Sequence, residues 1–194
     1  MCYQNVSCLR QQMKPLWRVH GIVKHGGERP NIIPAYSELQ FFLRTPDKTE
    51  LDLLRGKLSS CFEAAAIATG CKLELNFSDK PYWNFVTNNK MADAFKLNAE
   101  SLGVYFHSKV LTGSASSDIG NVSQVVPCIE PGFYIGHDSF PHTNAFREAA
   151  GDPKANKYTL DQGKSMALTC IDLLTKKGLL DSIKKEFNDQ NPSS

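Results

Sequence analysis

The sequence predicts an α/β protein, and three observations carry that prediction. Segments in which apolar residues alternate with polar ones, as in strands, occur beside longer segments whose apolar residues recur every three or four positions, as in helices. The 194 residues leave room for one ordinary domain or two small ones. With 41% hydrophobic and 22% charged residues, the composition is that of a folded globular chain.

The first 77 residues predict helix end, strand, strand, helix and strand, in that order. A helix remnant without a capping residue is expected before Pro15, which cannot continue it, and Gly70 suits the end of the long helix. The expected elements are a helix end at 3–13, strands at 17–23 and 37–44, a helix at 45–69 and a strand at 72–77. This order is that of an incomplete ferredoxin-like β-α-β unit, without its first strand and most of its first helix.

The segment 78–81 is the expected boundary, which gives one domain over residues 1–78 and a second over 79–194. In the second domain we expect helices at 88–102, 158–176 and 179–187, and short strands at 104–107, 122–129 and 132–136. Leu160, Ala167, Ile171 and Leu174 form the expected apolar side of the long helix. These strands are too few to close a large sheet by themselves.

Composition excludes several classes of function. The chain has 22 basic and 20 acidic residues, a net charge of +2, and no basic run longer than three residues, so a nucleic-acid partner is not expected. No apolar run approaches the roughly 18 residues that span a bilayer, and the first ten residues lack the plan of a secretory signal, so we expect a cytoplasmic protein without a membrane partner. The six cysteines are scattered without metal-binding spacing, which favours buried thiols such as Cys61 and Cys170 over disulfides or a nucleophile.

Three side chains are chemical candidates from their positions alone. His142 lies in a Gly- and Pro-bounded loop where a metal ligand could sit, although a lone loop histidine is usually solvated and one histidine cannot hold zinc. Asn31, between two prolines that restrict the backbone, is either a hydrogen-bond donor to a carbonyl or an ordinary turn residue. Arg44 ends a strand and suits two-pronged binding of a carboxylate, with a solvated surface arginine as the alternative.

The Gly- and Ser-rich loop at 113–120 is a candidate anion site. Its hydroxyl groups and free amides could surround an anion, with Ser116 and Ser117 at its centre. It lacks the Gly-Lys-Ser/Thr ending of a phosphate-binding P-loop, so it is not a nucleotide fingerprint. The equally favoured alternative is a turn in which the Asp118 side chain caps nearby amides.

Taken together, four segments resemble one known family. They are 26–34, which contains Asn31; Arg44, thirteen residues further on; 117–123; and 142–151, which begins with His142. In this order and spacing they are similar to the zinc metallopeptidases of family M-twenty, the aminoacylase and glutamate carboxypeptidase type, and most of all to its aminoacylase-one-like members. The resemblance extends over nearly the whole chain.

The resemblance implies a role for each candidate. His142 would be the last metal ligand, Asn31 would polarise the scissile carbonyl, and Arg44 would bind the terminal carboxylate of the substrate. Ser116 and Ser117 would line the substrate pocket, with Asp118 holding the shape of their loop.

The resemblance also implies an organisation and a reaction. Residues 1–78 would be the lid, through which family members form homodimers, and residues 79–194 the C-terminal part of the catalytic domain. The complete enzyme would use two zinc ions to hydrolyse dipeptides or N-acyl amino acids, β-alanyl dipeptides among them.

The chain departs from the family where most metal ligands would be. The His-x-Asp motif, the bridging Asp and the Glu pair of the family are absent, as is the catalytic His of the lid, and Glu130 stands where close relatives have His. We therefore expect a C-terminal portion that holds no zinc and is inactive alone. The alternative is a non-catalytic module that dimerises through the lid.

Overall fold

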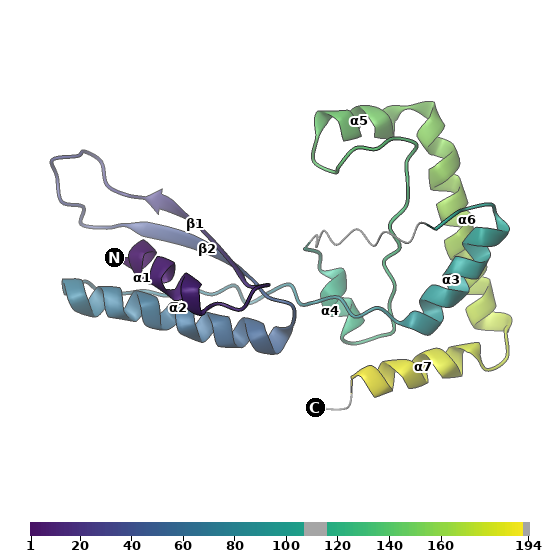
Figure 1. Ribbon diagram of the computed structural model, residues 1–194, viewed down its shortest axis with the longest axis horizontal. Helices are drawn as coiled ribbons and strands as arrows, with labels where there is room; N and C mark the ends of the chain where they lie inside the picture. The colour runs from purple at the N-terminus through teal and green to yellow at the C-terminus, as the bar shows by residue number, and fades with distance from the viewer. Residues whose placement is uncertain (107–115, 192–194) are drawn as a thin grey trace. The chain divides into compact units, whose positions relative to one another are not determined.

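The computed structural model describes residues 1–106 and 116–191 and confirms an α/β chain (Figure 1). It forms two compact units, residues 1–84 and 85–194, which are described separately. The first unit contains α1 (Cys2–Leu9), the 3₁₀ turn η1 (Arg10–Gln12), β1 (Arg18–His25), β2 (Glu38–Arg44) and α2 (Lys48–Thr69). The second contains α3 (Asn89–Ser101), α4 (Ile119–Ser123), α5 (Asn144–Gly151), α6 (Pro153–Thr175) and α7 (Leu179–Gln190).

The first unit is an antiparallel hairpin of β1 and β2 with α1 and α2 against one of its faces. Val19 lies opposite Leu43, and both point toward the helices because successive side chains of a strand alternate between faces. The core residues are Val6, Trp17, Val19, Leu54 and Leu58. Each large aliphatic residue buried here stabilises the unit by about 1.5–3 kcal/mol. Both strand predictions of the hairpin are confirmed.

The ends of α2 follow from local chemistry. The Asp47 carboxylate accepts a hydrogen bond from the Glu50 N–H at 2.8 Å and so satisfies one of the unpaired donors of the first turn. Gly70, with a φ of 68°, takes the left-handed conformation that terminates helices. The helix expected at 45–69 is therefore confirmed, with its start at Lys48 because Asp47 is the cap.

The strand expected at 72–77 is wrong. Among the described residues, no backbone ladder includes this segment, and the sheet contains only β1 and β2. The segment and the residues after it are held by α2 instead: the Arg55 guanidinium lies 3.9 Å from the Phe77 ring centre, and Lys48 Nζ lies 4.1 Å from that of Trp83. Alternation predicts a strand only if a neighbouring strand accepts its hydrogen bonds.

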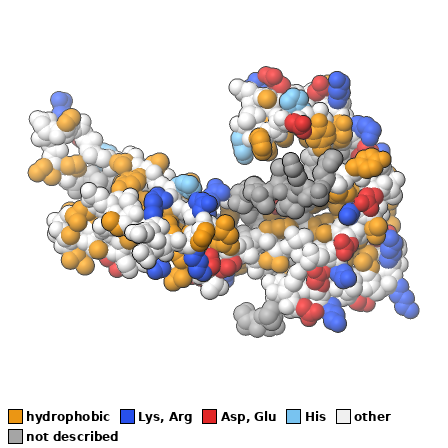
Figure 2. All heavy atoms as spheres, in the orientation of Figure 1, with side chains coloured by type: hydrophobic (Ala, Val, Ile, Leu, Met, Phe, Trp, Pro, Cys, Tyr) orange, Lys and Arg blue, Asp and Glu red, His pale blue; other side chains and the backbone are white. Residues whose placement is uncertain are grey.

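The second unit is built on α3, α6 and α7. Phe95 and Ala99 of α3 and Ile183 of α7 are buried. Between α3 and α6, Asn98 Nδ2 donates to Asp172 Oδ2 at 2.9 Å and contacts Thr169 Oγ1 at 3.3 Å. Charges of both signs are interspersed over these helices in Figure 2. The three predicted helices at 88–102, 158–176 and 179–187 are confirmed.

Asn88 joins three parts of the second unit. Its side chain is 1% exposed; Oδ1 accepts from the Met91 N–H and Nδ2 donates to the Ile183 carbonyl oxygen, each at 3.0 Å. Its own N–H donates to the Cys128 carbonyl oxygen at 3.0 Å. One residue therefore caps α3 and holds α7 through its side chain and fixes the segment at 128 through its backbone, because buried amides must have their hydrogen bonds satisfied.

The buried side of α6 differs from the expected one. Gln162, Ser165 and Thr169 face the interior, whereas Leu160, Ile171 and Leu174 are 61%, 54% and 84% exposed. Cys170, expected as a buried thiol, is exposed as well. The helix also begins earlier than expected, at Pro153, because the Asp152 side chain caps it and proline suits the first turn.

The remaining expectations for the second unit are partly wrong. Residues 119–123 form α4 where a strand was expected over 122–129, and neither 104–106 nor 132–136 is a strand. Residue 107, the end of the strand expected at 104–107, lies outside the described residues. α5 was not predicted. In the described parts of the chain, no helix is both long enough and apolar enough to cross a membrane.

Candidate functional site

Asn31 lies in the loop that joins β1 to β2. The Ile32 N–H donates to the Arg29 carbonyl oxygen at 3.2 Å, which closes a turn with Pro30 and Asn31 at its two central positions. Proline fixes the first of these positions, and asparagine is well tolerated at the second. The Asn31 side chain is exposed, so its amide is presented to solvent by a turn that proline makes rigid.

Arg44 is the last residue of β2, directly opposite Arg18 of β1. Because Val19 and Leu43 face the helices, Arg18 and Arg44 lie on the other face of the hairpin, where both are exposed. Arg44 stands at the opposite end of β2 from the loop that carries Asn31. At about 3.3 Å per strand residue, the length of β2 alone separates them by roughly 20 Å. A single chain therefore does not bring Asn31 and Arg44 together.

The Ser116–Asp118 segment leads into α4. The Ser117 hydroxyl accepts from the Ile119 N–H at 3.3 Å, and the Asp118 carbonyl oxygen accepts from the Asn121 N–H at 2.9 Å. The Asp118 side chain makes no capping hydrogen bond, so the capping expected of its carboxylate is performed by Ser117. Ser116 is exposed. The part of this loop before residue 116 lies outside the described residues.

His142 has an unusual backbone. Its φ is 67°, the one positive value among the described non-glycine residues. Pro141 precedes it, and the Thr143 hydroxyl closes the turn by donating to the Phe140 carbonyl oxygen at 2.8 Å. Thr143 then caps α5 by accepting from the Phe146 N–H at 3.1 Å. A left-handed non-glycine residue costs about 1–2 kcal/mol, so the turn holds the backbone of the exposed His142 in this conformation at an energetic expense.

A second energetically unfavourable feature lies three residues before His142. The Ser139 hydroxyl oxygen is buried, and no hydrogen-bond partner for it is found among the described residues. Strained backbone and unpaired buried polar groups cluster at functional sites, where a ligand compensates for them. Two such features within one short turn distinguish this loop from an ordinary connection. The Pro141-His142 pair could have indicated a turn, since proline is common at the second turn position, but it does not predict the positive φ of a histidine at the third.

The described residues do not fit a zinc site by themselves. No group of three His, Cys, Asp or Glu side chains within 1–106 and 116–191 lies close enough together to bind a metal ion. A zinc site needs three or four such ligands, and His142 would supply one.

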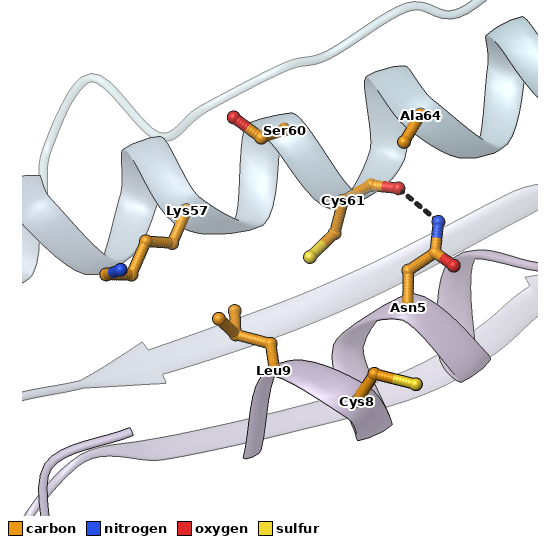
Figure 3. Close-up of a pocket in the computed structure, with 7 residues that line it drawn as sticks. All are labelled: Asn5, Cys8, Leu9, Lys57, Ser60, Cys61 and Ala64. Atoms are coloured by element: carbon orange, nitrogen blue, oxygen red, sulfur yellow. Dashed lines mark hydrogen bonds between the residues drawn. The ribbon is translucent and has the colours of Figure 1, made fainter. Parts of the chain in front are cut away.

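A groove between α1 and α2 is lined by none of the predicted site residues (Figure 3). Asn5 Nδ2 donates to the Cys61 carbonyl oxygen across it at 2.8 Å. Burial, and then the nearby Cys8 and Cys2 thiols, raise the pKa of Cys61. The thiol is thus kept protonated, and an unreactive thiol argues against a nucleophile there.

Comparisons with known proteins give these positions a context. No model of a known protein family matches the chain. Over 190 residues it is 48% identical to the "Xaa-Arg dipeptidase" of Mus musculus and 46% identical to that of Homo sapiens, in each case over 96% of this chain and 44% of the relative. It is 24% identical over 228 residues to one of the subunits of the p-aminobenzoyl-glutamate hydrolase of Escherichia coli (strain K12), over 87% of this chain and 47% of the relative.

The relatives are hydrolases by name, two of them dipeptidases, and they point to peptidase family M-twenty. The chain spans less than half the length of each.

Proposed function

We propose that this chain is part of an M-twenty amidohydrolase that cleaves the amide bond of dipeptides or N-acyl amino acids. The observation that carries the proposal is the 48% identity to the mouse Xaa-Arg dipeptidase along 96% of this chain. Dipeptides with a C-terminal arginine are the first substrate class to test, and β-alanyl dipeptides are the second. We place this activity in the cytoplasm.

The proposed division of labour gives the lid to residues 1–78 and the C-terminal part of the catalytic domain to 79–194. The hairpin and its two helices support it, because they enclose a core of their own. We propose that two lids form a homodimer. The roughly 20 Å of strand between Asn31 and Arg44 supports this, since a dipeptide is too short to touch both in one chain. In a dimer, Asn31 would serve the substrate held by the partner.

Each side chain has a task that its chemistry allows. The Arg44 guanidinium donates two parallel hydrogen bonds to the substrate carboxylate, and the Asn31 amide donates to the scissile carbonyl oxygen as negative charge develops there. Ser116 and Ser117 contact the substrate through their hydroxyl groups, while the Asp118 carbonyl holds the start of α4. Losing one donor to a developing oxyanion typically costs about 2.7–4 kcal/mol of transition-state stabilisation.

Zinc is the proposed metal, with His142 as one ligand. The strained turn supports this role because backbone strain of this kind concentrates at functional sites, and His142 is the strained residue. Two zinc ions would acidify a water molecule for attack on the amide. Since the described residues do not form a zinc site, the other ligands would come from elsewhere.

A chimera tests the function. This chain would replace the matching 44% of the mouse Xaa-Arg dipeptidase, and hydrolysis of an Xaa-Arg dipeptide would be measured with zinc content and oligomeric state. We expect a zinc-containing, active dimer. His142→Ala should remove activity and lower zinc content, and Arg44→Gln should raise KM for the free acid much more than for the C-terminally amidated dipeptide.

Two results would contradict the proposal. One is a folded, dimeric chimera without hydrolysis while the parent enzyme is active under the same conditions. The other is an Arg44→Gln variant that loses acid and amide substrates equally. If the chimera dimerises but neither binds zinc nor hydrolyses any dipeptide, the alternative of a non-catalytic dimerisation module is favoured.

A further inference from the structure

The face of the hairpin that α1 and α2 leave uncovered carries an unusual pair of charges. Arg18 and Arg44 are directly opposite each other in the register of β1 and β2, and both are exposed. The next pair on this face is His20 opposite Phe42, whose ring is 65% exposed. In the sequence, Arg44 alone was a candidate, because its position at a strand end suits carboxylate binding. The strand register that places Arg18 beside it follows from the fold.

Two like charges at directly opposed positions destabilise a sheet. Side chains so paired have Cβ atoms about 4.5–5.5 Å apart, and same-sign pairs at this distance are unfavourable. An anion between the two guanidinium groups reverses the sign of the interaction, because each arginine then faces a negative charge.

The Arg18 guanidinium is anchored at one of its nitrogens. Its Nη1 donates to the Pro15 carbonyl oxygen at 2.6 Å and to the Trp17 carbonyl oxygen at 2.7 Å. These two bonds use both N–H groups of Nη1 and tie the guanidinium to the start of β1. A guanidinium has five N–H groups, so three remain, on Nε and Nη2. Among the described residues, these three have no hydrogen-bond partner.

We propose that Arg18 is a second carboxylate-binding residue, which together with Arg44 forms a two-arginine site for the α-carboxylate of a small peptide or acylated amino acid. The carboxylate lies between the two guanidinium groups and accepts hydrogen bonds from Arg44 and from the Nε and Nη2 edge of Arg18. The exposed Phe42 ring beside the pair offers apolar surface to the rest of the ligand. The proposal rests on the function proposed above and adds a specificity residue to it.

The site requires a planar, two-oxygen anion with a free acid group. An amidated ligand lacks both the charge and the second acceptor, so the pair rejects it. Lysine at position 18 would keep the charge but lose the planar fork, because an ammonium group is a point charge. Arg18→Lys should therefore weaken binding about as much as Arg18→Gln.

The test uses the full 194-residue chain and needs no catalysis. N-acetylglycine is titrated while the Nε–H signals of the arginines are followed by NMR, with N-acetylglycinamide and inorganic phosphate as comparison ligands. We expect the Arg18 and Arg44 signals to shift together with the acid and not with the amide. Arg18→Gln should weaken the binding measured at Arg44 about tenfold, or ~1.4 kcal/mol. Lys24→Gln, an exposed charge change on the same strand, should leave it unchanged.

Each other outcome overturns the assignment. It fails if the Arg44 signal responds alone, if the amide or phosphate binds as well as the acid, if Arg18→Lys binds as the wild type does, or if nothing shifts at all. The outcome is separable from that of the proposed function. An active chimera in which Arg18→Gln leaves KM for free-acid dipeptides unchanged refutes only the role of Arg18. Carboxylate binding by a chain whose chimera is inactive refutes only the hydrolase.

Discussion

Replacing Glu186 by glutamine should loosen the first turn of α3. The Glu186 carboxylate reaches this turn from α7: Oε1 accepts from the Asn89 N–H at 2.9 Å and from Asn89 Nδ2 at 2.8 Å, and Oε2 accepts from the Lys90 N–H at 2.8 Å. A negative charge at a helix N-terminus also interacts favourably with the helix dipole. The substitution keeps the shape of the side chain and removes the charge.

The expected loss follows from these contacts. A hydrogen bond to a charged group contributes about 1.5–3 kcal/mol when desolvated, and a carboxylate at an exposed helix N-terminus about 0.3–1 kcal/mol. Glu186 is partly exposed and glutamine still accepts one hydrogen bond, so we expect a loss of about 1–2 kcal/mol. The Lys90 amide should then exchange its hydrogen roughly 5–30 times faster.

The pH dependence has a definite sign. Partial burial raises the pKa of Glu186, but the hydrogen bonds from Lys90 and Asn89 outweigh it and hold the pKa below its ordinary value of 4.5. A carboxyl with a lowered folded-state pKa stabilises the fold above its unfolded pKa, and this contribution is lost as pH falls through the folded value. The difference between wild type and Glu186→Gln should therefore be full at pH 7 and disappear in acid.

Hydrogen exchange at pH 7 and in acid, read by mass spectrometry or NMR, measures this. Asp189→Asn is the matched control: it removes the same charge from an exposed position of α7 that has no hydrogen bond or ion pair among the described residues. Equal effects of the two substitutions, or unchanged Lys90 exchange, would refute the argument, because bulk charge alone would then explain the result.

Three further predictions concern stability. Because His142 has a φ of 67°, the His142→Gly variant should be more stable than His142→Ala by about 1 kcal/mol in chemical denaturation. Both variants should be inactive in the chimera. Equal stability of the two variants would mean that the turn is unstrained. Gly21→Ala should lower the free energy of unfolding by about 1–3 kcal/mol, followed by Trp fluorescence, because the added Cβ meets the Phe41 ring. Gly56→Ala should raise it by about 0.5–1 kcal/mol, because the added Cβ on α2 points into open space. A gain in stability at both sites would contradict this reasoning. Asn88→Ala should lower the free energy of unfolding by about 2–4 kcal/mol, because it leaves the buried hydrogen-bond partners of the side chain unpaired. Unfolding followed by circular dichroism measures this, and a loss below about 1 kcal/mol would show that water replaces the amide.

Much of the fold could be predicted where a signal is local. The capping carboxylate of Asp47, the apolar spacing behind it and Gly70 define α2 almost to the residue, because all three act within one or two helical turns. The hairpin strands were predicted for the same reason, since period-two alternation matched a partner close in sequence.

The expectations that failed depended on distant partners. The alternating segment at 72–77 lacked a neighbouring strand and is held by Arg55 of α2 instead. Along α6, Leu160 and Leu174 indicated a buried side, yet Thr169 and Asp172 face α3, because the Asn98 amide needs polar partners and small side chains allow close approach. Periodicity cannot show which side of a helix another helix will cover.

By itself the sequence determined the long helices α2, α3, α6 and α7, the hairpin and the resemblance on which Asn31, Arg44 and His142 were proposed, because capping, turn formation and side-chain chemistry depend on residues that are near one another in the chain. Only the tertiary structure decided that Arg18 lies opposite Arg44 and that Asn31 stands a strand's length away. It alone also showed the strained backbone of His142. Strand register depends on the pairing of segments that are distant along the chain, and the torsion of a single turn residue is not specified by its residue type, so a linear pattern records neither.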